Sequence, residues 1–352
     1  MTTTTRSARR IPAPGAPSGI GGGSRFAVGV LAAVLFVASG CTAERLPDRS
    51  AFGIDTPALE RLEVDSDGHA LTVWARVPES AVATVLLLHG RTWSSLPDFD
   101  LQVEGESLSL MQALTGEDIA VYALDARGYG ATPRDETGWL DPDRMALDVV
   151  RVLEWLGEGT GAAPAVMGWS YGSTAAHLAA QRRPDLVAGV ALYGYWKDPA
   201  ALLPAQDDPA DPPARATTEE AARSDFITPG SISDRAVDAF VAAALEADPV
   251  RVDVRRAHAF NALSPDSLTV PTLILQGELD PIAPSAVQER LFRGLGTAHK
   301  SWVVLPGCDH AAHLERCMPR FVRALAGFVR EVAEPPASEP HRWKGVEEVS
   351  GA

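Results

Sequence analysis

Short apolar runs recur along most of the chain and predict a series of β-strands. The later runs are continuously apolar, which is typical of strands buried on both faces of a sheet. The first two runs are joined by the turn DSDGHA, so they predict an antiparallel entry into the sheet. The eight segments are RLEV (61–64), LTVWARV (71–77), TVLLLH (84–89), IAVYALD (119–125), PAVMG (164–168), AGVALYG (188–194), PTLILQG (271–277) and SWVVLPG (301–307).

Helical periodicity fills several of the gaps between these segments. The helix-like stretches are PDRMALDVVRVLEWLGEG (142–159), STAAHLAAQRR (173–183) and RFVRALAGFVREVA (320–333). In the last of them, apolar residues recur at helical spacing and predict one packed face. Strands that alternate with helices predict the α/β class, here a mostly parallel, doubly wound sheet of about eight strands that is covered on both sides.

One interval, from residue 195 to residue 265, breaks this alternation. It includes the acidic, proline-rich segment AQDDPADPPARATTEEAA, which is typical of a surface excursion, and an amphipathic helix at 234–249. We therefore predict a helical cap inserted after the sixth strand, above the carboxyl edge of the sheet. The core would then comprise residues 56–194 and 266–333, and residues 334–352 would form a disordered tail.

The N-terminal residues have the features of an export signal. Four arginines and no acidic residue precede the apolar run FAVGVLAAVLFV, which is too short to span a bilayer. We predict a signal peptide over residues 1–40 and a tether over 42–55. The run ends in Ala-Ser-Gly-Cys, which resembles a bacterial lipobox and implies lipidation of Cys41 and anchoring in the cell membrane, facing the extracytoplasmic side. The same residues also suit ordinary signal peptidase, which would make the protein secreted.

The length of the chain indicates how many domains it forms, and its charge indicates which binding partners to expect. At 352 residues, with 46% hydrophobic and 22% charged residues, the chain suits one large α/β domain or two ordinary ones. Its formal net charge of -15 would repel nucleic acid and anionic lipid headgroups. We therefore expect no nucleic-acid partner, and attachment to a membrane would come from lipid at Cys41. The oligomeric state stays open.

The stretch AVMGWSYGS places a serine between two glycines, after a buried strand and before a helix. In this setting the form G-x-S-x-G predicts a nucleophile elbow, a sharp turn that projects the serine hydroxyl above the edge of the sheet. Ser170, framed by Gly168 and Gly172, is therefore the candidate nucleophile. The alternative is a serine that only caps the following helix.

A serine hydroxyl needs a base within hydrogen-bonding reach and an acid that orients this base. On a sheet of this kind the acid and then the histidine follow the serine, each on a loop after a later strand. Asp280 lies three residues beyond PTLILQG, and His310 lies three residues beyond SWVVLPG. Asp198 is the alternative acid, and His313 is the alternative base. The spacing of the other histidines predicts no metal site.

Together these motifs resemble the α/β-hydrolase superfamily over residues 60–332. The resemblance is carried by GWSYG, ELDPIAP, PGCDH, HGRTW and DARGYG. It implies an esterase-like or lipase-like serine hydrolase that cleaves a small-molecule carboxylic ester, or a related acyl substrate, through an acyl-enzyme and without a cofactor. A nucleophilic serine separates the chain from the dehalogenase and epoxide-hydrolase branches, which use an aspartate at that position.

Negative charge on the substrate carbonyl oxygen must be met by fixed donors, which form an oxyanion hole. The backbone N–H of Tyr171, which follows the nucleophile, is one candidate donor. The second is expected from the loop after the His-Gly pair, with Arg91 as the candidate and Thr92 as the alternative.

Other residues of these motifs have structural interpretations. Asp125 and Arg127 resemble a superfamily element that braces the loop after the fourth strand, so we expect a structural role. Trp93, Tyr171 and Trp196 line the acyl or alcohol pocket in one interpretation and pack in the core in the other.

Setting Cys41 aside leaves two cysteines, Cys308 and Cys317, close together in the sequence. An exported protein could oxidise this pair, and the disulfide would then limit the movement of the His310 loop. The alternative is two free thiols.

Two other functions compete with an ester hydrolase. GWSYG also occurs in the prolyl oligopeptidase group, and capped aminopeptidases that release N-terminal proline share this layout. Such a serine peptidase needs carboxylates in the cap to bind a free amine, and the sequence does not identify them. A non-catalytic envelope lipoprotein with the same fold is the third candidate, which a complete set of triad residues disfavours.

Overall fold

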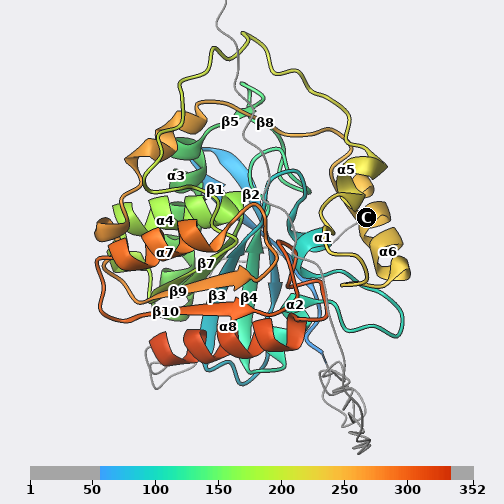
Figure 1. Ribbon diagram of the computed structural model, residues 1–352, viewed down its shortest axis with the longest axis vertical. Coiled ribbons are helices and arrows are strands. Elements are labelled where there is room, and N and C mark those ends of the chain that lie inside the picture. The colour runs from blue at the N-terminus through green and yellow to red at the C-terminus, as the bar shows by residue number, and fades with distance from the viewer. Residues whose placement is uncertain (1–55, 334–352) are drawn as a thin grey trace, which may run out of the picture. The chain divides into compact units, whose positions relative to one another are not determined.

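The computed structural model describes residues 56–333 and has an α/β fold built on a sheet of eight strands (Figure 1). The strands are β1 (Glu60–Ser66), β2 (His69–Arg76), β3 (Ala83–Leu88), β4 (Ile119–Leu124), β6 (Ala165–Trp169), β7 (Gly189–Tyr193), β9 (Thr272–Gly277) and β10 (Lys300–Leu305). Their order across the sheet is β1-β2-β4-β3-β6-β7-β9-β10. β2 pairs antiparallel with β1 and β4, and the remaining neighbours pair parallel. The predicted mostly parallel α/β sheet is confirmed.

The central strands form because their residues suit a sheet that is covered on both sides. Every position of β4 and of β9 is buried. Successive side chains of a strand point to opposite faces, so Leu86 and Leu88 of β3 pack on one face while their neighbours in the strand pack on the other. At the sheet's entry, Asp67 and Gly68 join β1 to β2 with φ values of 55° and 77°, which match the twist of an antiparallel hairpin.

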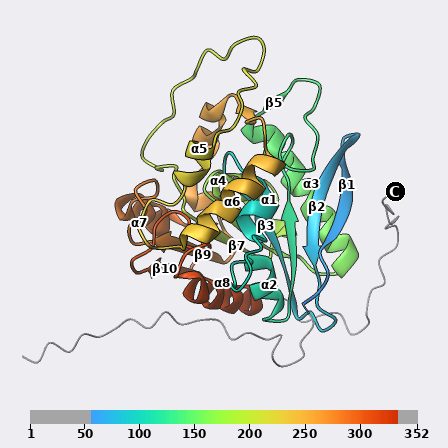
Figure 2. The ribbon, with the colours of Figure 1, turned by 90° about the vertical axis from the view of Figure 1, so that its right-hand side faces the viewer.

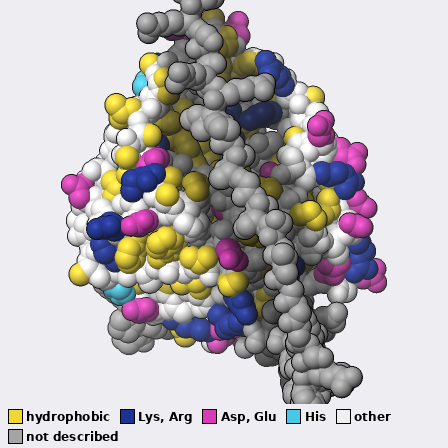
Figure 3. All heavy atoms as spheres, viewed as in Figure 1, with side chains coloured by type: hydrophobic (Ala, Val, Ile, Leu, Met, Phe, Trp, Pro, Cys, Tyr) yellow, Lys and Arg dark blue, Asp and Glu magenta, His cyan; other side chains and the backbone are white. Residues whose placement is uncertain are grey.

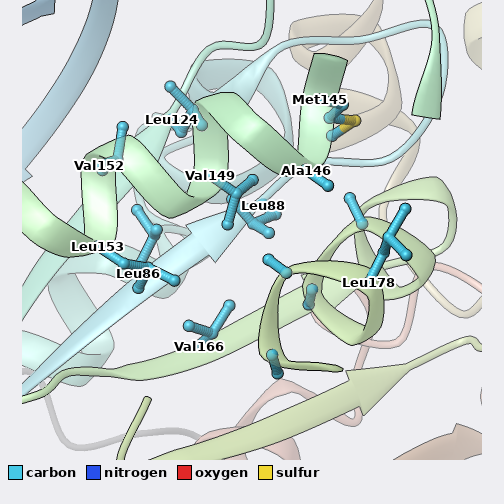
Figure 4. Close-up of a cluster of buried hydrophobic side chains, with 14 of the residues drawn as sticks. Leu86, Leu88, Leu124, Met145, Ala146, Val149, Val152, Leu153, Val166 and Leu178 are labelled. Carbon is cyan, nitrogen blue, oxygen red and sulfur yellow. The ribbon is translucent and has the colours of Figure 1, made fainter. Parts of the chain in front are cut away.

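Helices cover both faces of the sheet. One face carries α3 (Pro142–Thr160), α4 (Tyr171–Arg182) and α7 (Ser285–Gly294), and the other carries α1 (Ser95–Phe99), α2 (Leu110–Thr115) and α8 (Met318–Val332). Figure 4 shows the first of these cores, in which Leu86, Leu88 and Val166 of the sheet lie against α3 and α4. Short 3-10 helices span Pro184–Leu186, Ala257–Ala262 and Pro265–Ser267.

Several elements are not apparent from the sequence. Helices α1 and α2 span too few residues to show helical periodicity, and α7 has few apolar positions. A separate two-stranded ribbon pairs β5 (Trp139–Leu140) with β8 (Asp253–Val254). Its two strands have two residues each and lie far apart in the chain, so no local pattern predicts it.

The interval between β7 and β9 contains α5 (Glu219–Arg223), α6 (Asp234–Ala247) and β8. Figure 2 shows α6 next to α1, where Phe240 and Ala244 of α6 pack with Trp93 and Leu101 in a third apolar cluster. The cap and its bounds at 195 and 265 stay a prediction.

Three predicted segments fall outside the described residues. They are the signal peptide with Cys41, the tether over 42–55 and the tail over 334–352. No helix within residues 56–333 has the length and apolar character that crossing a membrane requires.

A buried ion pair braces the loop after β4. The Arg127 Nε atom lies 2.7 Å from Asp148 Oδ2, and Arg127 Nη2 donates to Asp148 Oδ1 at 2.8 Å. The Ser66 hydroxyl donates to the same carboxylate at 2.7 Å, so β1, α3 and this loop share one polar contact. The two charged side chains are only 6% and 2% exposed. Each charge therefore depends on the other for its neutralisation.

Replacing Asp148 by Ala is expected to destabilise the fold strongly, because it leaves the buried Arg127 guanidinium with only a 4.0 Å contact to Asp135. We expect the free energy of unfolding, measured by urea denaturation, to fall by about 3 to 5 kcal/mol. The control is Glu289→Ala, which removes an exposed pair with Arg293 whose side chains are 57% and 77% exposed and should cost less than about 1 kcal/mol. Equal losses in the two variants would contradict a structural brace.

Candidate active site

The chain turns sharply at Ser170, between β6 and α4. Ser170 has φ 53° and ψ -115°, a conformation that L-residues rarely adopt. Its side chain makes no capping hydrogen bond to α4, so the alternative of a simple helix cap does not describe the structure. A sharp strand-to-helix turn of this kind is what the predicted nucleophile elbow requires.

The two glycines that frame this turn are required by close backbone contacts. A Cβ atom on Gly168 would lie 2.2 Å from the carbonyl oxygen of Gly172, and one on Gly172 would lie 2.3 Å from that of Leu88. Any side chain at these positions would push α4 away from β6 and β3. The two glycines thus allow α4 to begin in direct contact with β6 and β3. This contact holds Ser170 at the end of β6.

Asp280 and His310 form a buried hydrogen-bonded pair. His310 Nδ1 lies 2.7 Å from Asp280 Oδ2, while Asp280 Oδ1 accepts from the amides of Ile282 at 2.8 Å and Ala283 at 3.0 Å. A carboxylate whose other oxygen is fixed by two amides orients the imidazole with Nδ1–H as donor and leaves Nε2 as an acceptor. This is the arrangement that a general base requires.

The backbone of His310 is tied to the two strands beside the elbow. Its carbonyl oxygen accepts from Trp169 Nε1 at 2.8 Å and from the Tyr193 hydroxyl at 2.5 Å. The imidazole lies against Gly194, where an added Cβ atom would come within 2.7 Å of His310 Cε1. Because the Ser170 amide donates to the Tyr193 carbonyl at 2.9 Å, the ring and the elbow meet at adjacent strand ends.

The contact between nucleophile and base is not closed in this structure. His310 is 6% exposed, and its Nε2 atom has no hydrogen-bond partner within residues 56–333, Ser170 included. Such contacts are often long in a free protein and tighten when substrate binds. The structure therefore brings Asp280 to His310 and leaves the hydroxyl of Ser170 unbonded beside them.

The two alternative residues have other partners. Asp198 pairs with Arg290 at 2.7 Å. His313 is fully buried, and its ring packs 4.5 Å from that of Trp169 and 5.5 Å from that of Tyr193. Burial lowers the pKa of His313 to about 3, so this imidazole stays neutral. Neither residue replaces Asp280 or His310.

The candidate oxyanion donors lie beside the elbow. Tyr171 is the first residue of α4, where a backbone N–H has no acceptor within the helix. The loop after β3 comes close as well, since a Cβ atom on Gly90 would lie 3.5 Å from Ser170 Cβ. The Thr92 amide donates to the Tyr129 hydroxyl at 3.4 Å, whereas the Arg91 amide has no such bond to any described residue. This favours Arg91 over Thr92.

Buried polar residues hold these loops, and sequence reasoning missed them. His89 contacts the Gly90 carbonyl through Nδ1 at 2.8 Å and accepts from the Ala126 amide through Nε2 at 3.1 Å, and burial lowers its pKa. Asp248 accepts from the amides of Ser94 at 2.7 Å and Gly130 at 2.8 Å. His89 is visible in the HGRTW motif, but nothing in the sequence near Asp248 indicates its partners.

Asp125, Trp93 and Trp196 have defined surroundings. Asp125 accepts from the Ser95 amide and from Trp74 Nε1, as expected of a structural brace. Trp93 is 1% exposed and donates from Nε1 to Asp225 at 2.6 Å. Trp196 is half-buried. The rings of Trp196 and Tyr171 both pack on Phe260, at 6.0 Å and 5.2 Å.

The loop that carries the candidate base is closed by a disulfide between Cys308 and Cys317. Inside it, the Asp309 amide donates to Glu315 Oε2 at 3.0 Å. Glu315 is 2% exposed, and burial raises its pKa to about 7. Within residues 56–333 no cluster of His, Cys, Asp and Glu could hold a metal ion.

Known proteins resemble the chain in sequence and in fold. Residues 79–317 match the model of a protein family, Hydrolase_4, which is described as serine aminopeptidase, S33. No curated protein matches the chain.

Three solved structures share the fold. They are an esterase, RhEst1, from Rhodococcus sp. ECU1013 (22% identity, 78% of this chain and 99% of that one, TM-score 0.57), a serine hydrolase involved in carbazole degradation (18%, 77% and 98%, 0.56) and a thermophilic esterase (21%, 78% and 99%, 0.54).

Replacing Gly194 by Ala is expected to displace the imidazole of His310, because φ is 57° and the methyl group would lie 2.7 Å from Cε1. Labelling of Ser170 by a fluorophosphonate probe should slow by roughly 10²-fold or more, the contribution of a general base. The matched control is Gly157→Ala in α3, where nothing outside the helix lies within 4 Å. Unchanged labelling of folded Gly194→Ala protein would contradict this placement of the base.

The raised pKa of Glu315 predicts a loss of stability as the pH rises. With a pKa of about 7 in the folded chain and 4.5 as its ordinary value, Glu315 binds more protons in the folded state between these values. Its contribution is fully present below pH 4.5 and is lost as the pH rises through 7.

Glu315→Gln should remove this pH dependence while keeping an acceptor for the Asp309 amide. Urea denaturation at pH 5 and pH 8 should give a smaller difference for the variant, by on the order of 2 to 3 kcal/mol. Other titrating groups, such as His313, contribute equally to both proteins. Identical differences in the two proteins would refute a protonated Glu315.

Proposed function

The chain belongs to the serine aminopeptidase S33 (Hydrolase_4) family and is a serine hydrolase of the α/β-hydrolase type, and on this premise we propose that it cleaves carboxylic esters through Ser170, His310 and Asp280. The observation that carries the proposal is the buried Asp280–His310 pair, whose unpartnered Nε2 atom lies beside a strained serine elbow. No cofactor is needed for this reaction.

The reaction follows from the properties of these groups. Ser170 Oγ attacks the acyl carbon while His310 Nε2 takes its proton, and Asp280 stabilises the imidazolium that forms. The backbone N–H groups of Tyr171 and Arg91 donate hydrogen bonds to the oxyanion of the tetrahedral intermediate. Collapse expels the alcohol, which takes the proton from His310, and leaves an ester of Ser170. A water molecule, deprotonated by His310, then releases the acid and restores the serine.

Esterases among the proteins with this fold support an ester substrate. Their sequences are 21% and 22% identical to this chain, so the likeness is one of architecture. Ser170 is partly exposed, so a small-molecule acyl compound could reach its hydroxyl. In this proposal the interval over 195–265 serves as a cap that shapes the substrate site.

Aminopeptidase activity is a second candidate because of the family's description and of Asp225. This half-buried carboxylate accepts from Trp93 Nε1 at 2.6 Å through one oxygen. Burial raises its pKa to about 6, while the Trp93 hydrogen bond and the nearby His310 lower it. A carboxylate next to the base could bind the ammonium group of a peptide. Asp309 is a second carboxyl group near Asp225, but it accepts from the Thr228 and Ala311 amides. We rank the ester hydrolase first because Asp225 is already engaged by Trp93.

Export and anchoring complete the proposal. The leader over residues 1–40 and the lipobox-like Cys41 would attach the mature protein to the cell membrane on its extracytoplasmic side, or leader cleavage would release it as a secreted protein. A disulfide between Cys308 and Cys317 suits an oxidising compartment.

Substituting Ser170 by Ala tests the function. The wild-type protein should react with a fluorophosphonate probe and hydrolyse a short-chain p-nitrophenyl ester, and Ser170→Ala should lose labelling and lower kcat by roughly 10⁴ to 10⁶. Ser301→Ala, which alters an exposed serine of β10, is the matched control. Folded wild-type protein that is neither labelled nor active would favour a non-catalytic binding protein.

The same assay separates the two hydrolases. An ester hydrolase should prefer the p-nitrophenyl ester over proline p-nitroanilide. Faster cleavage of the anilide, lost in Asp225→Asn, would instead favour the aminopeptidase.

A further inference from the structure

Four arginines near the candidate oxyanion hole lack close ionic partners, although the chain as a whole is acidic. We call Arg91, Arg134, Arg251 and Arg255 the arginine rim. Within residues 56–333, Arg91, Arg134 and Arg251 form no ion pair, and Arg255 has only a 3.9 Å contact with Asp141. Other arginines of the chain do have close partners, at 2.7 Å in Arg290–Asp198 and 2.8 Å in Arg76–Asp100, although Arg61 and Arg316 also form no ion pair with a described residue. No carboxylate of the described residues therefore lies closer than 3.9 Å to a guanidinium nitrogen of the rim.

Three segments bring the rim together beside Ser170. The Arg134 side chain donates through Nη2 to the carbonyls of Val250 and Arg251, both at 2.9 Å. Val252 packs on the loop after β4, where a Cβ atom on Gly128 would lie 3.3 Å from it. The next residue of that loop, Tyr129, accepts from the Thr92 amide. The loops after β3 and β4 and the segment around β8 are therefore neighbours.

Figure 3 shows basic side chains near the top of its view, where Figure 1 places β5 and β8. The Arg255 guanidinium carbon lies 6.0 Å from the centre of the Trp139 ring of β5.

The same region contains buried donors without acceptors. The Tyr171 hydroxyl, Trp139 Nε1, Arg134 Nη1 and Arg255 Nε are buried and make no hydrogen bond to any described residue. The whole of Tyr171 and of Trp139 is only 6% exposed. All four atoms carry a hydrogen, so the region has an excess of donors, and leaving such groups unsatisfied is costly.

The Tyr171 hydroxyl connects this region to the reaction centre. Tyr171 directly follows Ser170, and its backbone N–H is a proposed oxyanion donor. Burial raises the pKa of Tyr171, and the charge of Arg91 opposes this rise, as expected of a guanidinium close to the hydroxyl. Asp141 is the acidic group that faces the same hydroxyl, and it is the partner of Arg255.

We propose that the arginine rim binds an anionic group, a carboxylate or a phosphate, on the substrate of the ester hydrolase proposed above. Guanidinium groups hydrogen-bond to both anions with matching geometry. The backbone N–H of Arg91 is the proposed second oxyanion donor, and its guanidinium would bind the anion. The anionic group and the reacting carbonyl would then be separated by about the length of one arginine side chain. The substrate class is therefore a short acyl ester with a charged end. Asp225, which accepts from Trp93 and is influenced by the charge of His310, would repel an anion at its own position.

The matched substrates are the p-nitrophenyl monoester of glutarate and p-nitrophenyl pentanoate, which have acyl chains of equal length with and without a terminal carboxylate. We expect the wild-type kcat/KM to favour the glutarate ester by about 10-fold or more, the worth of a charge-assisted hydrogen bond. Arg251→Gln and Arg91→Gln should each lower this ratio by about 10-fold while the backbone donor of residue 91 remains. Added salt should also lower the ratio. Arg293→Gln, on the exposed surface of α7, is the control and should keep the wild-type ratio.

A second substrate pair separates the two anions. If the protein prefers an acylglycerol phosphate over the acylglycerol, and the preference depends on Arg251, the anion is a phosphate on the alcohol side of the ester. If it prefers only the glutarate ester, the anion is a carboxylate on the acyl side. Ratios near one for both pairs, or ratios that Arg251→Gln leaves unchanged, would overturn the proposal.

A binding measurement keeps this test independent of catalysis. Glutarate or inorganic phosphate should raise the Tm of Ser170→Ala protein, and Ser170→Ala/Arg251→Gln should lose the shift while its circular dichroism stays that of the folded protein. If ester hydrolysis fails but the shift and its Arg251 dependence persist, the proposed function is wrong and the anion site stands. If hydrolysis occurs without a shift and without charge preference, the anion site is wrong and the function stands.

Discussion

The direct contact of α4 with β6 and β3 is the constraint on which the rest of the site depends. Gly168 and Gly172 permit it, because a Cβ atom on either would lie within 2.3 Å of a backbone oxygen. The helix can then begin immediately after the strand only if the residue between them adopts φ 53°, and that residue is Ser170. Backbone packing thus stores strain at the position where a reactive hydroxyl is presented, and the surrounding core maintains it.

The candidate base is positioned by contacts to the same strand ends. Trp169 precedes the serine and Tyr193 ends the adjacent strand, and both hold the carbonyl of His310. Asp280, fixed by two backbone amides, sets the orientation of the ring. A disulfide closes the loop from its other side. The candidate base is therefore held by rigid elements of the fold.

Charge is distributed unequally around this centre. On the side of the base, Asp225, Asp309 and Glu315 place carboxyl groups near His310 or within its loop. Near the candidate oxyanion donors, Arg91 and Arg251 form no ion pair with described residues, while the buried carboxyl groups of Asp98 and Asp248 accept from backbone amides of the same loop. Fields of opposite sign on the two sides of a reacting carbonyl favour one orientation of a polar substrate. In the proposal above, the same loops would serve both the chemistry and the choice of substrate.

The sequence by itself determined the elements with strong local patterns. Continuous apolar runs specified the eight strands, and the glycine–serine motif specified the turn at Ser170, because side-chain periodicity and steric limits act over a few residues. The order of the candidate residues also pointed to Asp280 and His310. Only the tertiary structure shows that Asp198 pairs with Arg290 and that aromatic rings enclose His313, and these contacts favour Asp280 and His310 as the candidates. The β5–β8 ribbon, Asp225 and the arginine rim likewise left no local signal. Their contacts join residues that are about a hundred or more positions apart, and such contacts exist only once the chain has folded.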